Sequence, residues 1–226
     1  MKVESPSADI LAQLEELQLD PARPLIISDA DEVLLRFMER LDHYLETKGL
    51  WIDLSSYALA GNIKSLSTNQ PVEVPTLLDD FFNSQTAHIE PTKGAADALA
   101  RLAQRAQIIV LTNLPLSEKP RRKENLVQHG MDYPVIVGNG LKGPAVAWLD
   151  AQIIDAPVFF LDDIPHNIDS AAQHAPDVHR IHFVADPRLG KLIGAAKGAD
   201  TRIDVWSQAY EWIRTKIDSY DGRTMS

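Results

Sequence analysis

The sequence contains no cysteine, so disulfides, thiolate catalysis and zinc–thiolate sites are excluded. It is also poor in positive charge, because 22 lysine and arginine residues face 32 acidic residues and the formal net charge is −10. This balance disfavours a nucleic-acid surface and an attraction to anionic membranes. The one compact basic run, residues 121–123, is interpreted as the solvated face of a helix.

Long apolar runs are missing as well. No stretch approaches the roughly 20 apolar residues of a membrane-spanning helix. The first residues are acidic and amphipathic and lack the apolar centre of a signal peptide, so we expect a soluble cytoplasmic protein. What the chain does have is a 45% hydrophobic content in 226 residues, which suits one domain with an insertion or two small domains.

Short apolar runs alternate with amphipathic segments along most of the chain. The runs "LIIS", "IIVL", "PVIV" and "PVFFL" are typical of buried parallel strands, and helical patterns lie between them. This alternation predicts an α/β fold, a Rossmann-like doubly wound parallel sheet. Residues 37–89 break the rhythm, so we expect them to form a small, mainly helical insertion into a core made of residues 1–36 and 90–226.

Polar residues follow each of these four strands, at the edge where sheets of this kind bind ligands. Acids two apart after the first strand share a face if the extended conformation persists. Several carboxylates in one crevice require a cation, for which oxygen ligands favour Mg²⁺, while a hydroxyl and an ammonium group suit a phosphoryl group. In chain order the residues are Asp29 and Asp31, Thr112 and Asn113, Lys142, and Asp162 and Asp163.

The order of these residues resembles the haloacid dehalogenase (HAD) superfamily of phosphohydrolases. The matching stretches are "IISDADEVLL", "IIVLTNLP", "GLKGP" and "FFLDDIPHN". They span residues 24–186 outside the insertion, and the insertion lies where this family carries a cap domain over the site. The resemblance implies a Mg²⁺-dependent phosphatase that acts on a small phosphorylated metabolite through an aspartyl-phosphate.

The resemblance also implies a role for each matching residue. Dehalogenating members lack the second acid, so Asp31 favours phosphate-ester chemistry. Leu161 and Asn167 depart from the commonest pattern, which leaves their effect on metal affinity open. The implied roles are Asp29 as nucleophile, Asp31 as general acid and base, Thr112, Asn113 and Lys142 as phosphate-binding groups, and Asp29, Asp31 (through its backbone carbonyl), Asp162 and Asp163 as Mg²⁺ ligands. Lys64 and His166 are the candidates for substrate contact, and a solvated side chain is the alternative for His166.

Other functions remain open on the same residues. One is a phosphomutase, which would need a cap that excludes water. Another is a HAD-like binding protein without turnover. A response-regulator receiver also gathers Asp, Thr and Lys around Mg²⁺, but its acid pair comes first in the chain, whereas Asp162 and Asp163 come last. The expected partner is a small phosphate ester, with no nucleic acid and no membrane, and no oligomeric state is predicted.

Overall fold

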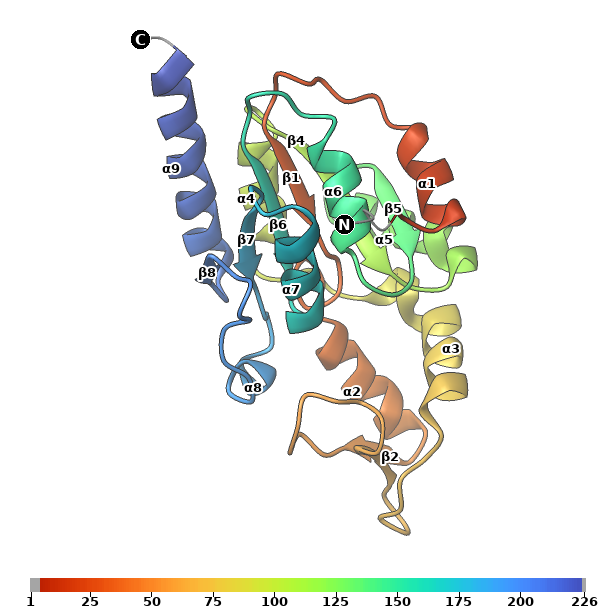
Figure 1. Cartoon of the computed structure of the whole chain (residues 1–226). Coiled ribbons are helices and arrows are strands. Elements are labelled where there is room, and N and C mark those ends of the chain that lie inside the picture. The colour runs from red at the N-terminus through yellow and green to blue at the C-terminus, as the bar shows by residue number, and fades with distance from the viewer. Residues whose placement is uncertain (1–4, 225–226) are drawn as a thin grey trace.

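The computed structural model describes residues 5–224, with a six-stranded sheet at the centre. Residues 1–4 and 225–226 of the predicted core segments lie outside the described residues. Every pairing in the sheet is parallel, which confirms the predicted Rossmann-like architecture. The spatial order is β5 (Val135–Gly138), β4 (Gln107–Asn113), β1 (Leu25–Ser28), β6 (Val158–Asp162), β7 (His179–His182) and β8 (Thr201–Arg202) (Figure 1).

Successive residues of the central strands face opposite sides of this sheet. Ile26 packs in one apolar cluster, whereas Leu25 and Ile27 belong to the other. Phe159 and Phe160 in β6 divide in the same way. Because both faces are apolar, each must be covered by helices, and this explains the unbroken apolar runs in the sequence.

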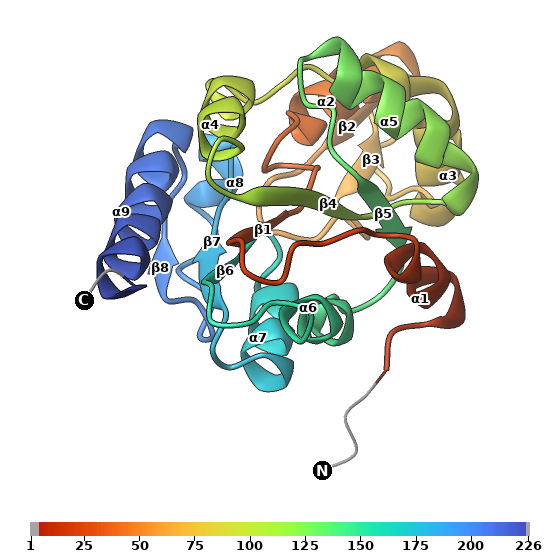
Figure 2. The same ribbon diagram turned by 90° about the horizontal axis from the view of Figure 1, so that it is seen from above.

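Helices cover both faces, as Figure 2 shows from above. Those that pack on one face are α1 (Ala8–Glu15), α6 (Gly143–Asp150) and α7 (Pro165–His174). Those on the other face are α4 (Ala95–Leu102), α5 (Lys119–Gln128) and α9 (Trp206–Thr224). The short helices η2 (Leu116–Glu118) and α8 (Pro187–Gly190) lie in connections. Within residues 5–224, no helix combines the length and apolar character needed to cross a membrane.

The segment between β1 and α4 forms a layer of its own beyond one end of the sheet (Figure 1). It contains α2 (Phe37–Thr47), an antiparallel hairpin of β2 (Leu50–Ile52) and β3 (Ile63–Ser65), α3 (Val74–Gln85) and η1 (Thr86–His88). Aromatic rings join the two α-helices, with ring centroids of Phe37 and Phe81 5.2 Å apart and those of Tyr44 and Phe81 5.5 Å apart. The hairpin was not predicted, because strands of three residues carry too short a pattern.

Glu32 ties this layer to the core. Its carboxylate accepts hydrogen bonds from the backbone N–H groups of Met38 at 2.7 Å and Asp186 at 2.9 Å. Met38 lies in the first turn of α2, and the N-cap residue of that helix makes no side-chain cap hydrogen bond. Glu32 therefore satisfies an open donor at the positive end of the helix. Burial raises the pKa of Glu32 to about 7.

Candidate active site

Three carboxylates meet where β1 and β6 end. Asp29 follows β1, Asp162 is the last residue of β6, and Asp163 follows it. One oxygen from each lies within 4.8 Å of the others, and all three residues are buried. The structure therefore brings together three of the four acids predicted for the metal site.

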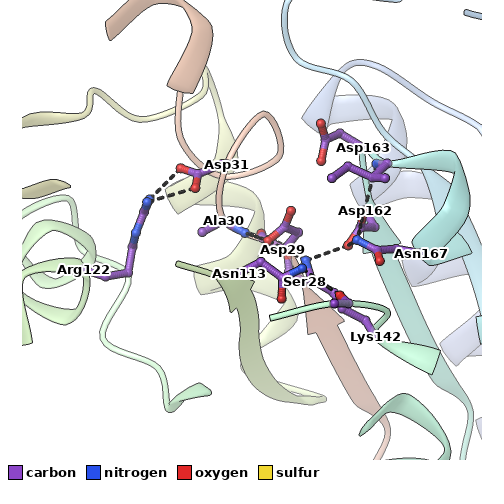
Figure 3. A network of polar contacts seen from close by, with 12 residues as sticks. Ser28, Asp29, Ala30, Asp31, Asn113, Arg122, Lys142, Asp162, Asp163 and Asn167 are labelled. Atoms are coloured by element: carbon purple, nitrogen blue, oxygen red, sulfur yellow. Dashed lines mark hydrogen bonds and ion pairs between the residues drawn. The ribbon is translucent and has the colours of Figure 1, made fainter. Parts of the chain in front are cut away.

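One ammonium group balances part of this charge. The Nζ atom of Lys142, at the start of α6, lies 2.7 Å from Asp29 Oδ1 and 2.7 Å from Asp162 Oδ2 (Figure 3). Burial alone would lower the pKa of Lys142, but the carboxylates of Asp162 and Asp29 raise it above its ordinary value. Lys142 is therefore charged, and the cluster keeps an excess of two negative charges when all three acids are ionised.

Burial and the excess negative charge both raise the pKa values of Asp162 and Asp163. Burial raises the pKa of Asp162 to about 6, an effect that Lys142 opposes and Asp29 reinforces. Burial and the charges of Asp162 and Asp29 raise the pKa of Asp163 well above its usual value. The Asn167 amide donates to both oxygens of Asp162, at 3.0 and 3.2 Å. Asn167 thus orients an acid, in a position where the HAD resemblance would more often place another acid.

Asp31 lies apart from the three-acid cluster. Figure 3 shows its carboxylate pointing toward Arg122, on the side away from Asp162 and Asp163. Arg122 Nη2 donates to Asp31 Oδ2 at 3.0 Å, and Nη1 lies 2.8 Å from Oδ1. The chain leaves β1 in a turn at this point instead of continuing as a strand, so side chains two apart do not share a face. The expected convergence of the Asp29 and Asp31 side chains is therefore absent, and a metal-binding role for the Asp31 carbonyl stays a prediction.

Arg122 corrects the interpretation of the basic run. Its side chain is fully buried within α5, whereas a solvated helix face was expected. Its neighbours Arg121 and Lys123 are partly exposed and pair with Glu118 and Asp132. Burial raises the pKa of Asp31, and the adjacent Arg122 limits that rise.

Thr112 and Asn113 end β4 in different surroundings. Thr112 Oγ1 is buried and has no hydrogen-bond partner among the described residues. Asn113 borders the cavity below the insertion, and its amide donates to the Gly140 carbonyl at 2.8 Å. A buried hydroxyl without a partner is costly unless a ligand satisfies it. The hydroxyl is thus free for the predicted phosphate contact, although Thr112 does not itself line the cavity.

A cavity of about 230 Å³ separates the acids from the insertion. Neither predicted substrate contact lines it. Lys64 is held within the hairpin, where its Nζ lies 2.7 Å from Asp53 Oδ2 and 5.4 Å from the centre of the Trp51 ring. His166 is exposed in the first turn of α7. Both residues lie in other surroundings, so the structure does not support either as a substrate contact.

Tyr57 is the residue of the insertion that does reach the acids. Its hydroxyl donates to Asp163 Oδ2 at 2.5 Å and lies 3.1 Å from the Asp163 carbonyl oxygen. Burial and the charge of Asp163 raise the pKa of Tyr57 above its ordinary value, so the hydroxyl remains a donor. Tyr57 lies in the loop between β2 and β3. A single tyrosine in a loop carries no sequence signal that could have revealed this contact.

Comparison with known proteins decides the fold. No protein-family model matches the sequence, and no curated protein matches it. A HAD-like hydrolase from Streptococcus pneumoniae superimposes with a TM-score of 0.59 at 10% identity over 86% of this chain and 100% of that one. The chain has the HAD fold.

Two further solved structures share the HAD fold. A β-phosphoglucomutase-like protein from Thermotoga maritima gives a TM-score of 0.54 at 14% identity, covering 85% of this chain and 99% of that one. A HAD hydrolase from Bacillus subtilis, bound to magnesium, gives 0.51 at 11% identity, covering 86% and 99%. At identities this low, the structural similarity shows the fold alone, and the chemistry depends on the residues of this chain.

The acid cluster suits the divalent metal found in that magnesium-bound HAD structure. Asp29, Asp162 and Asp163 offer carboxylate oxygens within 4.8 Å of one another. Oxygen donors are the ligands that Mg²⁺ prefers, and Mg²⁺ takes only a few protein ligands beside water and phosphate. Two positive charges are also what the cluster lacks after Lys142 is counted. The residues therefore fit Mg²⁺ by donor type and by charge.

Buried carboxyl groups with raised pKa values predict an unusual pH dependence of stability for the metal-free protein. Glu32 has a pKa of about 7 in the fold against 4.5 in the unfolded chain, and Asp162 shifts upward to about 6. The folded state thus binds these protons more tightly, so their stabilisation is complete below about pH 4 and is lost as the pH rises through 7. For Glu32 alone this loss is on the order of 3 kcal/mol.

We expect a higher melting temperature near pH 5 than near pH 8 in the presence of a chelator. Mg²⁺ binds the ionised carboxylates, so it should stabilise the protein much more at pH 8 than at pH 5. Thermal denaturation with EDTA and with Mg²⁺ at both pH values measures this. A metal-free protein that is more stable at pH 8 than at pH 5 would contradict the prediction.

Proposed function

We propose that this protein is a Mg²⁺-dependent phosphohydrolase that cleaves a small phosphorylated metabolite through an aspartyl-phosphate intermediate. The observation that supports this most directly is the buried group of three acids around Lys142, open to a cavity at the carboxyl ends of the strands. A nucleophile, a fixed positive charge and a cation site in one crevice are the requirements of phosphoryl transfer.

Asp29 is the proposed nucleophile. Its Oδ1 atom accepts a hydrogen bond from the Ala30 backbone N–H at 2.7 Å and lies 2.7 Å from Lys142 Nζ, which leaves Oδ2 available for attack. Asp29 attacks phosphorus, the bond from phosphorus to the ester oxygen breaks, and that oxygen takes up a proton. Water then attacks the phosphorus of the acyl phosphate, releases inorganic phosphate and restores the carboxylate. Each turnover consumes one phosphate ester and one water.

The remaining residues hold the phosphoryl group and its charge. Lys142 neutralises an oxygen of the transferred group, and Thr112 and Asn113 donate hydrogen bonds to it. Mg²⁺, held by Asp29, Asp162 and Asp163, supplies positive charge to the phosphate oxygens when it is bound. Phosphoryl transfer depends mainly on positioning and charge stabilisation, and a small number of fixed groups suffices.

Asp31 is the proposed acid that protonates the leaving oxygen and then the base that activates water. Its contact with Arg122 holds the carboxylate away from Asp29 in this structure (Figure 3). Proton transfer to the ester oxygen therefore requires the carboxyl group to turn from Arg122 toward the cavity, which Asp31 already borders. The salt bridge is the resting position of this side chain in the proposed cycle.

The insertion, residues 37–89, acts as a cap in this proposal. The insertion contributes most of the apolar wall of the cavity. The hydrogen bond from Tyr57 to Asp163 holds the insertion over the acids. A phosphomutase that acts on a sugar phosphate must hold a second phosphate group beside the one it transfers. The phosphomutase alternative is therefore weaker, because among the described residues Lys142 is the only cationic side chain that lines the cavity. A cytoplasmic location and a small-molecule partner, without nucleic acid or membrane, belong to the same proposal.

The direct test is phosphate release from p-nitrophenyl phosphate. We expect turnover with Mg²⁺, none with EDTA, and recovery when Mg²⁺ is added in excess of the chelator. A mutase would instead return the phosphoryl group to a sugar phosphate and release little phosphate. Tight Mg²⁺ binding, seen as a rise in melting temperature, with no phosphate release from a broad set of esters would favour the binding-protein alternative and contradict the proposal.

A further inference from the structure

The cavity has two chemically different sides. Its acid side contains Asp29, Asp31, Asn113, Lys142 and Asp163. The opposite side is formed almost entirely by apolar side chains, most of them from the insertion. The larger of these are Phe37, Met38, Ile52, Leu54, Leu59, Leu78 and Phe82, with Leu189 from α8 and Ile164 beside the acid pair. A phosphate bound at the acids would thus point its organic part into an apolar space.

The few polar groups on the apolar side are already engaged. Both Glu32 oxygens accept backbone hydrogen bonds, from Met38 and Asp186. The Tyr57 hydroxyl donates to Asp163. Ser56 is exposed, and its oxygen accepts a hydrogen bond from Asn62 at 2.7 Å. Within the described chain, no lysine, arginine or histidine lines this side, so a second anion would find no counter-charge there and most ring hydroxyl groups of a sugar would meet apolar surface.

We propose that the substrate is the phosphate monoester of a small apolar alcohol or phenol, an inference that rests on the proposed phosphohydrolase function. Burial of apolar substrate surface against such a wall favours binding, whereas each substrate hydroxyl group buried there without a partner lowers the affinity on the order of tenfold. The size agrees, because an apolar cavity of about 150 Å³ holds one benzene ring. A cavity of about 230 Å³ accommodates one six-membered ring and a short link to the phosphate.

Two esters of matched shape test this inference. Cyclohexylmethyl phosphate and glucose 6-phosphate share a six-membered ring, a methylene link and one phosphate, but only the sugar carries ring hydroxyl groups. With Mg²⁺ present, we expect kcat/KM for the cyclohexyl ester to exceed that for the sugar ester by about 100-fold or more. Equal rates, or a preference for glucose 6-phosphate, would overturn the substrate class while leaving the phosphohydrolase function intact.

A matched pair of variants tests whether the apolar wall of the cavity causes the preference for the cyclohexyl ester. Leu78→Gln adds an amide to the cavity wall and should raise KM for the cyclohexyl ester about tenfold, with little effect on glucose 6-phosphate. Leu66→Gln makes the same change at an exposed position of the insertion outside the cavity and should change neither value. Equal effects of the two variants, or a Leu78→Gln effect shared by both esters, would show that the wall does not select the organic group.

Binding separates this inference from the failure of the proposed function. Calorimetry of the Mg²⁺-loaded Asp29→Asn protein measures affinity for the two esters without turnover. If wild-type protein releases phosphate from none of a broad set of esters, these two included, but the variant binds the cyclohexyl ester at least tenfold more tightly than the sugar ester, the phosphohydrolase proposal fails and the apolar specificity stands. If it binds neither, or binds the sugar ester as well, the inference is overturned.

Discussion

Replacing Asp29 with Asn is expected to lower phosphate release by at least about 10³-fold, because the amide oxygen is not a nucleophile at phosphorus. The substitution keeps the size of the side chain, and an amide oxygen can still accept the hydrogen bond from the Ala30 N–H. Loss of activity would therefore come from the missing carboxylate rather than from a displaced loop. Release of inorganic phosphate from p-nitrophenyl phosphate measures it.

The same variant gives a second, independent signal. The substitution would remove one of three buried carboxylates that face a single lysine, so the metal-free variant should be at least as stable as the wild type. Its gain in melting temperature on adding Mg²⁺ should be smaller, since one ligand charge is gone. Asp79→Asn, at an exposed position of α3, is the matched control and should leave both activity and metal response unchanged. An Asp29→Asn protein with wild-type turnover would refute the mechanism.

Much of the core could be predicted because its signals are local. The strand β1 is a run of four buried residues, short enough to indicate a strand rather than a helix, and Asp29 follows it directly. Parallel topology then places the ends of neighbouring strands at one edge, so Asp29 and the Asp162–Asp163 pair meet although they are far apart in sequence. The order of the strands and acids along the chain was therefore enough to predict that these three acids meet.

The insertion could not be predicted in the same way, because its contacts depend on how it folds back over the core. Lys64 is a predicted substrate contact, but in the structure it pairs with Asp53 of the same hairpin. Tyr57 has no distinguishing neighbours in sequence, and its role depends on Asp163, 106 positions away. The apolar wall, likewise, is made of ordinary hydrophobic residues whose common surface exists only after folding.

Arg122 shows the same limit inside the core. A basic residue between two others in an amphipathic helix is normally solvated, and Arg121 and Lys123 are indeed partly exposed. Arg122 lies on the inward side of α5, where its charge is balanced by Asp31, 91 positions earlier. Sequence patterns report the average environment of a charge, whereas a buried ion pair is a specific long-range exception.

This ion pair leads to the second large prediction. Replacing Arg122 with Met fills a similar volume but leaves Asp31 without its counter-charge, and we expect a loss of about 3 kcal/mol in the free energy of unfolding. Lys123→Met, one position away in the same helix, removes a partly exposed lysine that pairs with the exposed Asp132, and it should cost less than about 1 kcal/mol. Urea denaturation of both variants at neutral pH makes the comparison.

Two further measurements separate a role in positioning Asp31 from simple packing. The double variant Arg122→Met with Asp31→Asn should recover part of the lost stability, because it removes the unpaired charge instead of the contact alone. In the single variant the pKa of Asp31 should rise, since Arg122 holds it down, so the activity that requires protonated Asp31 should persist to higher pH. A single variant as stable as Lys123→Met, with an unshifted pH profile, would show that Arg122 does not control Asp31. If both effects appear, the resting salt bridge sets the pH range over which Asp31 can deliver its proton.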